Sequence, residues 1–190
     1  HMSQKGLEEI KNPSEMFLAE RSTNAAGTTI YPSLEGTRPI LVEVQALVSN
    51  ASYGTPQRNT NGFDYKRLSM LIAVLEKRVG IPLGSKDVFV NLVGGLKIDD
   101  PALDLAIISS IASSIMDKNI NKSTVLCGEV GLAGEVRSIN RIAHRLSEAK
   151  SLGFETALVP ASTLKRSKNL NLGMDLKPVE FVKDAFKFLF

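Results

Sequence analysis

The chain has 190 residues, of which 43% are hydrophobic and 23% charged, and its formal net charge at pH 7 is +3. These values are typical of a soluble globular protein with one domain, possibly carrying a small appendage. No apolar run approaches the length of a membrane span and no signal peptide is recognisable, so the sequence predicts a cytoplasmic protein without a membrane partner. The mild basicity permits an anionic partner without requiring one.

Residues 1–27 are predicted to lie outside the folded domain. His1 and Met2 resemble the remnant of a tag, and the polar stretch after them is interpreted as a linker or N-terminal extension. Within it, Ser14 is expected to be the N-cap of a short helix. The domain itself is expected to span residues 28–190.

Two strands are predicted at the start of the domain, over residues 28–33 and 40–49. A turn containing Gly36 joins them into a hairpin. The second strand alternates imperfectly between polar and apolar residues, which is typical of a half-exposed antiparallel strand. Residues 50–62 are polar and are predicted to form a loop, whose length indicates function or mobility.

Two helices follow, separated by a buried strand over residues 88–93. Asp64 is the predicted N-cap of the first helix, and Gly80 is expected to end it. Asp100, with a proline after it, is the predicted N-cap of the second helix. This second helix is apolar on nearly every side, so we expect other elements to cover it.

The rest of the chain alternates short strands with helices. The predicted elements are strands over residues 124–128, 135–138 and 156–159, a helix capped by Asn140 and ended by Gly153, and an amphipathic helix over residues 179–190. The basic stretch over residues 162–171 is predicted as loop. The order of elements predicts a mixed α/β (α+β) fold, with a mixed sheet packed against helices.

Two stretches resemble the proteolytic domain of Lon-type ATP-dependent proteases, which implies a fold of the ribosomal S5 domain 2 type. Residues 97–104 read Lys-Ile-Asp-Asp-Pro-Ala-Leu-Asp, where the Lon family has Pro-Lys-Asp-Gly-Pro-Ser-Ala-Gly with its nucleophilic serine. Residues 125–136 are similar to the Lon motif that precedes the catalytic lysine. Aligned on these motifs, the serine position is Ala102 and the lysine position is Ala143. Alanine offers no nucleophilic or basic atom, so the resemblance implies a domain without peptidase activity.

Three further segments, residues 12–21, 34–48 and 62–78, resemble the RadA (Sms) family of bacterial recombination and repair ATPases. Members of that family carry a zinc finger and a RecA-like ATPase ahead of this domain, and the chain has neither a Cys-x-x-Cys nor a Gly-x-x-x-x-Gly-Lys-[Ser/Thr] motif. The resemblance implies that ATP, Mg and Zn belong to those other domains and that this domain holds no cofactor. It also implies a homo-hexameric ring and a RecA-like recombinase as partner.

Basic side chains are the candidate contacts to DNA, because arginine and lysine hold backbone phosphates without regard to sequence. We interpret seven as candidate DNA-binding residues: Arg38, Arg58, Lys66, Arg67, Arg137, Arg141 and Arg145. Arg38 and Arg137 are the first choices, since each is expected at a strand end where a rigid scaffold would aim it. If a helix begins at Arg141, His144 and Arg145 share one of its faces. A third basic cluster contains Lys165, Arg166 and Lys168. For every one of these residues the alternative is an ordinary solvated surface.

Other chemistry has weaker support in the residue pattern. Four serines inside the second helix are interpreted as packing residues rather than displaced nucleophiles: Ser109, Ser110, Ser113 and Ser114. The lone Cys127 excludes an internal disulfide, fits a reducing compartment and is interpreted as a core residue. His144 has no second histidine or cysteine at ligand spacing, so no metal site is expected. Lys97 is interpreted as a partner in a surface salt bridge.

Three functional hypotheses remain. The favoured one is a catalytically inactive Lon-like domain that serves a RadA-type ATPase as a DNA-binding and oligomerisation platform in recombinational repair and branch migration. The second is a purely structural hexamerisation scaffold that never touches DNA. The third is an active Ser-Lys peptidase with relocated catalytic residues.

Overall fold

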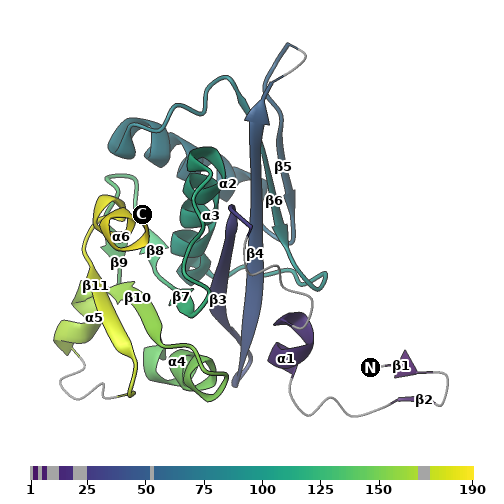
Figure 1. Cartoon of the computed structure of the whole chain (residues 1–190), viewed down its shortest axis with the longest axis vertical. Helices are drawn as coiled ribbons and strands as arrows, with labels where there is room; N and C mark the ends of the chain where they lie inside the picture. The colour runs from purple at the N-terminus through teal and green to yellow at the C-terminus, as the bar shows by residue number, and fades with distance from the viewer. Residues whose placement is uncertain (1, 4–5, 8–12, 19–24, 52–53, 167–171) are drawn as a thin grey trace.

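The structure, a computed structural model, describes residues 2–3, 6–7, 13–18, 25–51, 54–166 and 172–190. The predicted mixed α/β fold is confirmed, and Figure 1 shows its arrangement. The strands are β1 (Met2–Ser3), β2 (Gly6–Leu7), β3 (Thr28–Glu35), β4 (Arg38–Asn50), β5 (Arg58–Asn61), β6 (Lys86–Leu92), β7 (Thr124–Leu126), β8 (Glu129–Val130), β9 (Val136–Arg137), β10 (Thr156–Pro160) and β11 (Asp175–Val179). The helices are α1 (Pro13–Leu18), α2 (Tyr65–Val74) with a π-helical turn η1 (Leu75–Val79), a 3-10 turn η2 (Pro101–Leu103), α3 (Asp104–Met116), α4 (Ile142–Ser151), α5 (Ala161–Arg166) and α6 (Val182–Leu189).

The larger sheet has four strands in the order β3-β4-β6-β5. β3 and β4 form the predicted hairpin, β6 pairs antiparallel with β4, and β5 is parallel to β6. From Ile40 to Val44, β4 is buried on both faces rather than half exposed, and even Glu43 is only 2% exposed. The reason is tertiary, since α3 packs on one face of the hairpin while α1 and α4 also contact it.

The smaller sheet contains only parallel strands, in the order β11-β10-β7. The mixed sheet expected from the element order is therefore divided into two main sheets, with β8 and β9 forming a separate two-stranded hairpin and β1 pairing with β2. β11 lies in a stretch without a predicted element, except for Val179, which the sequence assigns to the last helix. It contains Pro178, which an edge strand tolerates because a proline cannot donate a ladder hydrogen bond.

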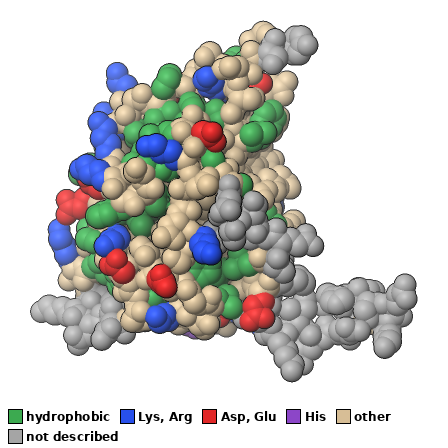
Figure 2. Space-filling model, viewed as in Figure 1, with side chains coloured by type: hydrophobic (Ala, Val, Ile, Leu, Met, Phe, Trp, Pro, Cys, Tyr) green, Lys and Arg blue, Asp and Glu red, His purple; other side chains and the backbone are tan. Residues whose placement is uncertain are grey.

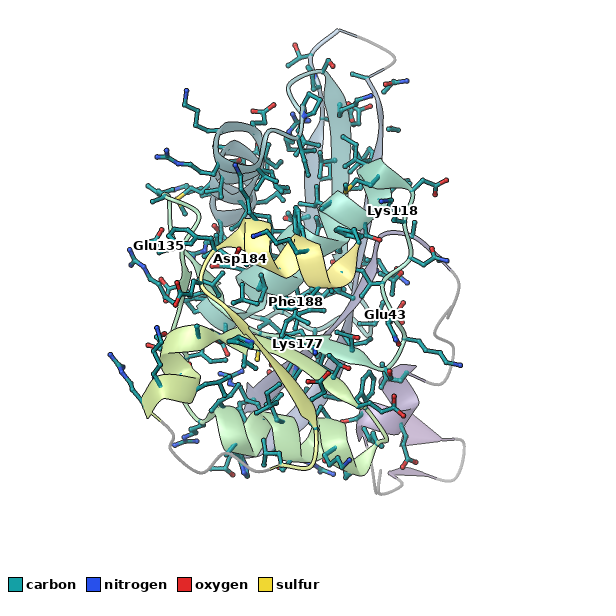
Figure 3. All side chains as sticks on the ribbon, turned by 60° about the vertical axis from the view of Figure 1, so that its left-hand side comes forward. Glu43, Lys118, Glu135, Lys177, Asp184 and Phe188 are labelled. Atoms are coloured by element: carbon teal, nitrogen blue, oxygen red, sulfur yellow. The ribbon has the colours of Figure 1, made fainter. Side chains whose placement is uncertain are left out.

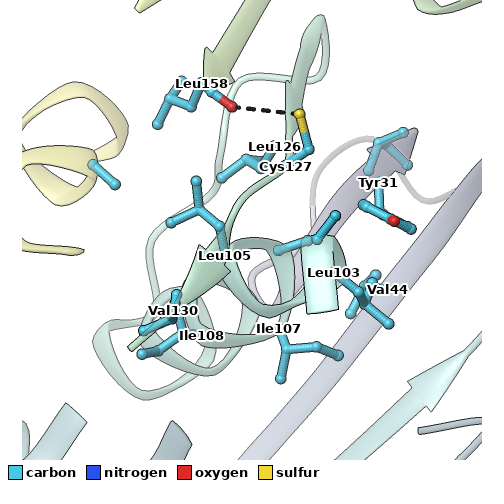
Figure 4. Packing of buried hydrophobic residues seen from close by; sticks show 14 of the residues in the cluster. Tyr31, Val44, Leu103, Leu105, Ile107, Ile108, Leu126, Cys127, Val130 and Leu158 are labelled. Atoms are coloured by element: carbon cyan, nitrogen blue, oxygen red, sulfur yellow. Dashed lines mark hydrogen bonds between the residues drawn. The ribbon is translucent and has the colours of Figure 1, made fainter. Parts of the chain in front are cut away.

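Helix α3 stands between the two sheets and forms the centre of the core, as its apolar sequence predicts (Figure 1). All of its residues from Asp104 to Ser113 are buried. Figure 4 shows Leu105 and Ile108 of this helix beside Val130, with Cys127 close to Leu158. Burial raises the pKa of the Cys127 thiol to about 12, so the thiol stays protonated.

Two serines near the end of α3 form hydrogen bonds to the hairpin of the larger sheet and to the residue just before it. Ser113 Oγ accepts a hydrogen bond of 2.8 Å from the N–H of Gly27, and Ser114 Oγ accepts one of 2.9 Å from the N–H of Val48. Gly27 has a φ of +85°, and a Cβ there would lie 2.2 Å from the carbonyl oxygen of Ala46. Only glycine lets the chain enter β3 so close to β4. The packing interpretation of these serines therefore agrees with the structure.

Two of the predicted helix caps were wrong and two were right. Ser14 lies within α1 instead of capping it, and its hydroxyl accepts from Leu41 N–H and donates to Glu148 at 2.9 Å. Asn140 does not cap α4, because Arg141 occupies the N-cap position in a left-handed conformation. Asp64 does cap α2, through the N–H of the residue three positions later, and Asp100 caps the 3-10 turn η2 that leads into α3, through the N–H of the residue two positions later.

Two elements lie inside stretches that were expected to be loops. β5 falls within residues 50–62 and α5 within residues 162–171, apart from its first residue. Neither segment has the apolar periodicity that predicts a strand or a helix. β5 is formed instead by its hydrogen bonds to β6 at the edge of the sheet, and α5 follows directly on the buried strand β10. Residues 21–24, which the sequence assigns to the N-terminal extension, and Lys168 lie outside the described residues.

Candidate nucleic-acid interface

The two positions that align with the Lon catalytic residues lie in different surroundings. Ala102 is 2% exposed, and its carbonyl oxygen accepts a hydrogen bond of 2.8 Å from the N–H of Gly128. Ala143 is exposed in the first turn of α4. Neither side chain can attack a carbonyl or move a proton. Ser109, Ser110 and Ser113 of α3 are buried in the core, where they serve packing.

An ionic cluster lies at Asp100, the residue that precedes the 3-10 turn η2. Arg145 is 5% exposed, and its guanidinium donates to Asp100 Oδ2 at 2.6 Å, to the Tyr31 hydroxyl at 2.7 Å and to two backbone carbonyls. The Tyr31 hydroxyl in turn donates to Asp100 Oδ2 at 2.6 Å. Burial alone would raise the pKa of Asp100, but the hydrogen bonds from Tyr31, from the N–H of Ala102 and from Arg145 outweigh it and lower that pKa. Burial raises the pKa of Tyr31, so this side chain remains a neutral donor.

A second ion pair joins α2 to α3. Arg67 donates through Nε to Asp104 Oδ1 at 2.9 Å and through Nη2 to the other carboxylate oxygen. Asp104 has a fully buried side chain and also accepts from the N–H of Val130 at 2.9 Å. Burial is the largest influence on Asp104 and holds its pKa above the ordinary value despite these donors. A carboxylate in an otherwise apolar helix needs such a partner, which is the signal that could have identified this pair from the sequence.

Three of the seven candidate DNA-binding residues thus use their guanidinium groups for hydrogen bonds inside the fold. Arg67 pairs with the buried Asp104, Arg145 pairs with the partly buried Asp100, and Arg58 donates to the carbonyl oxygens of Leu83, Lys86 and Gln57. The expectation that His144 and Arg145 share a face was wrong, because His144 is exposed while Arg145 points into the core. A buried guanidinium cannot reach a phosphate without breaking its own ion pair, so Arg145 is not available as a DNA contact.

The remaining four candidates are exposed: Arg38, Lys66, Arg137 and Arg141. Arg38 is the first residue of β4 and Arg137 is the last residue of β9, so both occupy strand ends as predicted. Arg137 donates to Glu135 Oε1 at 2.6 Å, and this hydrogen bond lowers the pKa of Glu135. Figure 3 shows Glu135 at the outer edge of the molecule. In the third cluster, Lys165 and Arg166 are exposed, and Lys165 pairs with Glu180 at 3.0 Å.

The tip of the β3–β4 hairpin lies against the start of α4. The guanidinium of Arg141 donates to the carbonyl oxygen of Gly36 at 3.4 Å, and His144 Nε2 lies 2.6 Å from the carbonyl oxygen of Thr37. Arg38 follows Thr37 directly, and Arg137 precedes Arg141 by four residues. We refer to Arg38, Arg137 and Arg141 together as the arginine strip. The contacts bring Arg38 and Arg141 to the same end of the hairpin, and Arg137 lies at the end of β9, four residues before Arg141 in the chain.

A groove of mixed polarity that the sequence did not reveal lies next to Arg137. It has a volume of about 400 Å³ between α2 and the β8–β9 hairpin, and its lining includes two arginines, Arg67 and Arg137, and two glutamates, Glu129 and Glu135. Its rim exposes two large apolar side chains, Met70 at 41% and Leu132 at 65%. Figure 2 shows several Lys and Arg side chains along one edge of the molecule, interspersed with apolar and acidic ones. Basic charge on this face is therefore distributed rather than gathered in one block.

The described residues contain neither a metal-ion cluster nor a membrane-spanning helix. No three His, Cys, Asp or Glu side chains within the described ranges are grouped in a way that could hold a metal ion. None of the helices in those ranges is both long and apolar enough to cross a membrane.

Known proteins resemble this chain over most of its length. The family model described as subunit ChlI of Mg-chelatase matches residues 63–163, just over half of the chain. The DNA repair protein RadA of Bacillus subtilis is 53% identical over 163 residues, which cover 86% of this chain and 36% of that protein. The chain belongs to the RadA family and contains its ChlI-like domain. The predicted resemblance to RadA and the predicted Lon-like fold class are thereby confirmed.

Other RadA proteins extend the match to nearly all residues of this RadA-type chain. The DNA repair protein RadA of Aquifex aeolicus is 45% identical over 190 residues, which cover 100% of this chain and 41% of that protein. The one from Chlamydia muridarum is 41% identical over 189 residues, covering 99% of this chain and 42% of that protein. The chain thus spans less than half of the length of these relatives.

Proposed function

We propose that this RadA-type domain binds DNA through its arginine strip and contributes to DNA repair as a platform without peptidase activity. The observation that carries the proposal is that Arg38 at the end of the hairpin and Arg141 at the start of α4 are exposed and lie close together through the Arg141–Gly36 contact, while Arg137 is exposed at the end of β9. Guanidinium groups bind phosphates by charge and paired N–H donors, independently of base sequence. The names of the RadA relatives, all DNA repair proteins, support the same role.

The existing ion pair of Arg137 does not prevent this role. Its side chain is 58% exposed, and its partner Glu135 is 29% exposed. Exposed ion pairs of this kind contribute only about 0–1 kcal/mol. Arg137 can therefore exchange the carboxylate for a DNA phosphate at little cost, whereas Arg67, with its buried partner Asp104, and Arg145, itself buried, cannot leave their ion pairs so easily.

For the whole protein we propose the wider RadA role. The domain would form one tier of a homo-hexameric ring and hold DNA for a RecA-like motor, in recombinational repair and branch migration alongside a recombinase. ATP, Mg²⁺ and Zn²⁺ would bind in other domains, and this domain would need no cofactor. The rival proposal, an assembly scaffold that does not contact DNA, draws support from the two exposed apolar side chains at the rim of the groove, Met70 and Leu132.

We expect weak binding of duplex DNA without sequence preference. Each phosphate contact should contribute roughly −0.9 to the slope of log affinity against log salt concentration, so that three contacts yield a slope of roughly −2.7. Fluorescence anisotropy with two duplexes of unrelated sequence, measured over a salt series, tests this expectation. Equal affinities and a negative slope support DNA binding, whereas no binding even at low salt favours the scaffold.

We expect no peptidase activity. Ala102 and Ala143 stand where the hydroxyl and the amine would be needed, and loss of a nucleophile alone removes most of the rate of such an enzyme. Unfolded casein should remain intact on incubation with the domain, and a serine-reactive fluorophosphonate probe should not label it. Labelling of one serine between Ser109 and Ser114 would contradict this expectation and revive the peptidase hypothesis.

A further inference from the structure

The N-terminus of α4 has an unusual start. Arg141, the residue before the helix, has a φ of +54° and forms no side-chain cap within the described part of the chain. The first helical hydrogen bond runs from the N–H of Arg145 to the carbonyl oxygen of Arg141 at 3.1 Å. The N–H groups of Ile142, Ala143 and His144 precede it, so helix geometry leaves them without an intrahelical acceptor. The positive end of the helix dipole is located at the same place.

A hollow of about 360 Å³ opens at this N-terminus, between the start of α4 and α5. Its lining includes two exposed cationic side chains, Arg141 and Arg166, and the uncharged polar residues Ser138 and Asn140. No carboxylate belongs to its lining residues within the described part of the chain. Figure 1 shows α4 and α5 at the same end of the molecule, beside the smaller sheet.

An unsatisfied hydroxyl in this hollow provides a second and independent observation. Thr163 of α5 lines the hollow and is only 5% exposed, yet its Oγ1 has no hydrogen-bond partner in the described structure. A buried hydroxyl without a partner is costly, and most buried polar groups in proteins are paired. The Oγ1 atom itself is buried in the wall of the hollow, so it would donate to an acceptor oxygen there after a rotation of the Thr163 side chain.

We propose that this hollow is a binding site for a phosphate group. A tetrahedral oxyanion would accept from the N–H groups at the start of α4, as anions do at helix N-termini. The guanidinium groups of Arg141 and Arg166 would supply charge and further donors. The small exposed side chain of Ala143 leaves the first-turn N–H groups open to the ligand. The hydroxyl of Thr163, rotated toward the hollow, would complete the set of donors.

The phosphate group can have two sources, the backbone of DNA or a free phosphate such as that of a nucleotide. The inference does not rest on the proposed DNA binding, because inorganic phosphate alone tests the site. Should DNA be the source, Arg141 would belong both to the arginine strip and to this site, and the strip would end in a defined phosphate position.

The first test is a titration of the ¹⁵N-labelled chain with inorganic phosphate, followed by amide resonances in NMR spectra at constant ionic strength with chloride as the reference anion. We expect saturable downfield shifts of the amides of Ile142, Ala143 and His144, which chloride does not produce. Absence of saturable shifts at these three amides would overturn the proposal.

Two variants test the same site without endangering the fold. Ala143→Glu places a carboxylate in the hollow, and an acidic residue in the first turn is favourable for the helix itself. Arg141→Gly removes the guanidinium and retains the left-handed backbone, which glycine adopts freely. We expect phosphate affinity to fall by about tenfold in each, the size of one charge-assisted contact.

The controls separate the site from general charge effects. Lys118→Ala removes one positive charge at an exposed position beyond α3 (Figure 3) and should bind phosphate like the wild type. Thr163→Val removes the unpaired hydroxyl and should weaken phosphate binding without lowering the melting temperature. If Ala143→Glu and Arg141→Gly bound phosphate as tightly as the wild type, the site would be excluded.

A short DNA duplex distinguishes the two sources. If the duplex shifts the amides of Ile142, Ala143 and His144 and inorganic phosphate competes with it, the source is the DNA backbone. If inorganic phosphate shifts them and the duplex does not, the source is a free phosphate, and the site stands in either case. DNA binding elsewhere on the domain is judged separately by anisotropy, so failure of one proposal does not imply failure of the other.

Discussion

Replacing Arg145 by alanine is expected to lower the free energy of unfolding by about 3 kcal/mol, because it leaves a partly buried carboxylate without its cation. The substitution removes the hydrogen bond of 2.6 Å to Asp100, the one of 2.7 Å to the Tyr31 hydroxyl and two hydrogen bonds to backbone carbonyls. The value is at the lower end of the range for buried ion pairs, since the Asp100 side chain is 29% exposed. Urea unfolding followed by far-UV circular dichroism measures it.

Matched variants identify the cause of this destabilisation. Arg137→Ala removes an exposed arginine from a surface ion pair and should change stability by less than about 1 kcal/mol. Asp100→Asn keeps an oxygen for the helix cap but removes the charge, so it should destabilise as well. If Arg145→Ala cost no more than Arg137→Ala, the buried cluster would not be a stabilising element.

The pKa of Asp100 adds a pH readout to the same experiment. Its pKa is lowered in the folded chain, so the folded state binds this proton less readily than the unfolded state does. The carboxylate therefore stabilises the fold at pH values above its unfolded pKa of about 4, and this contribution disappears as the pH falls through the folded pKa. Arg145→Ala should be destabilised less by acidification than the wild type, because one of the groups that lower this pKa is gone.

Replacing Arg38 and Arg137 together by alanine is expected to weaken binding of duplex DNA on the order of 100-fold, since each charge-assisted hydrogen bond to a phosphate is worth about 1.5 kcal/mol. The decrease should be equal across DNA sequences, because phosphates carry no base identity. The slope of log affinity against log salt should become shallower by roughly 1.8. Anisotropy with the duplexes used for the wild type measures both effects.

A second double variant serves as the control for net charge. Lys118→Ala combined with Lys183→Ala removes the same charge from exposed positions outside the arginine strip. It should reduce the affinity only slightly. If both double variants weakened binding alike, general attraction rather than the strip would hold DNA. In the ring proposed above, weak contacts would add up through effective concentration, so the same two double variants are also compared in the full-length protein.

Asp100 accepts more hydrogen bonds in the structure than its sequence context predicts. An aspartate before a proline at a helix start predicts an N-cap, and removal of such a cap costs about 1 kcal/mol. The cap exists, with the N–H of Ala102 at 3.0 Å from Oδ1. The other oxygen of the same carboxylate, however, accepts from Tyr31 and Arg145, which lie 69 and 45 positions away in the chain. Local sequence signals identify the cap, whereas no local pattern points to the cluster.

The sequence alone determined what depends on neighbouring residues and on composition. The hairpin around Gly36, the caps Asp64 and Asp100, and the burial of α3 follow from turn residues, capping side chains and apolar periodicity. The family resemblance also came from the sequence, since its motifs are contiguous. Polar segments such as β5 escaped prediction, because their hydrogen bonds are supplied by a strand far away in the chain.

Only the tertiary structure decided which arginines face solvent. By sequence, Arg141 and Arg145 are neighbours on one helix with equal charge, yet the first is exposed and the second is 5% exposed. The difference arises because the turn that begins α3 places a carboxylate, and β3 places a tyrosine hydroxyl, opposite Arg145. A charge enters a core only where such partners are present, and the partners come from segments whose separation in the chain exceeds any periodic pattern.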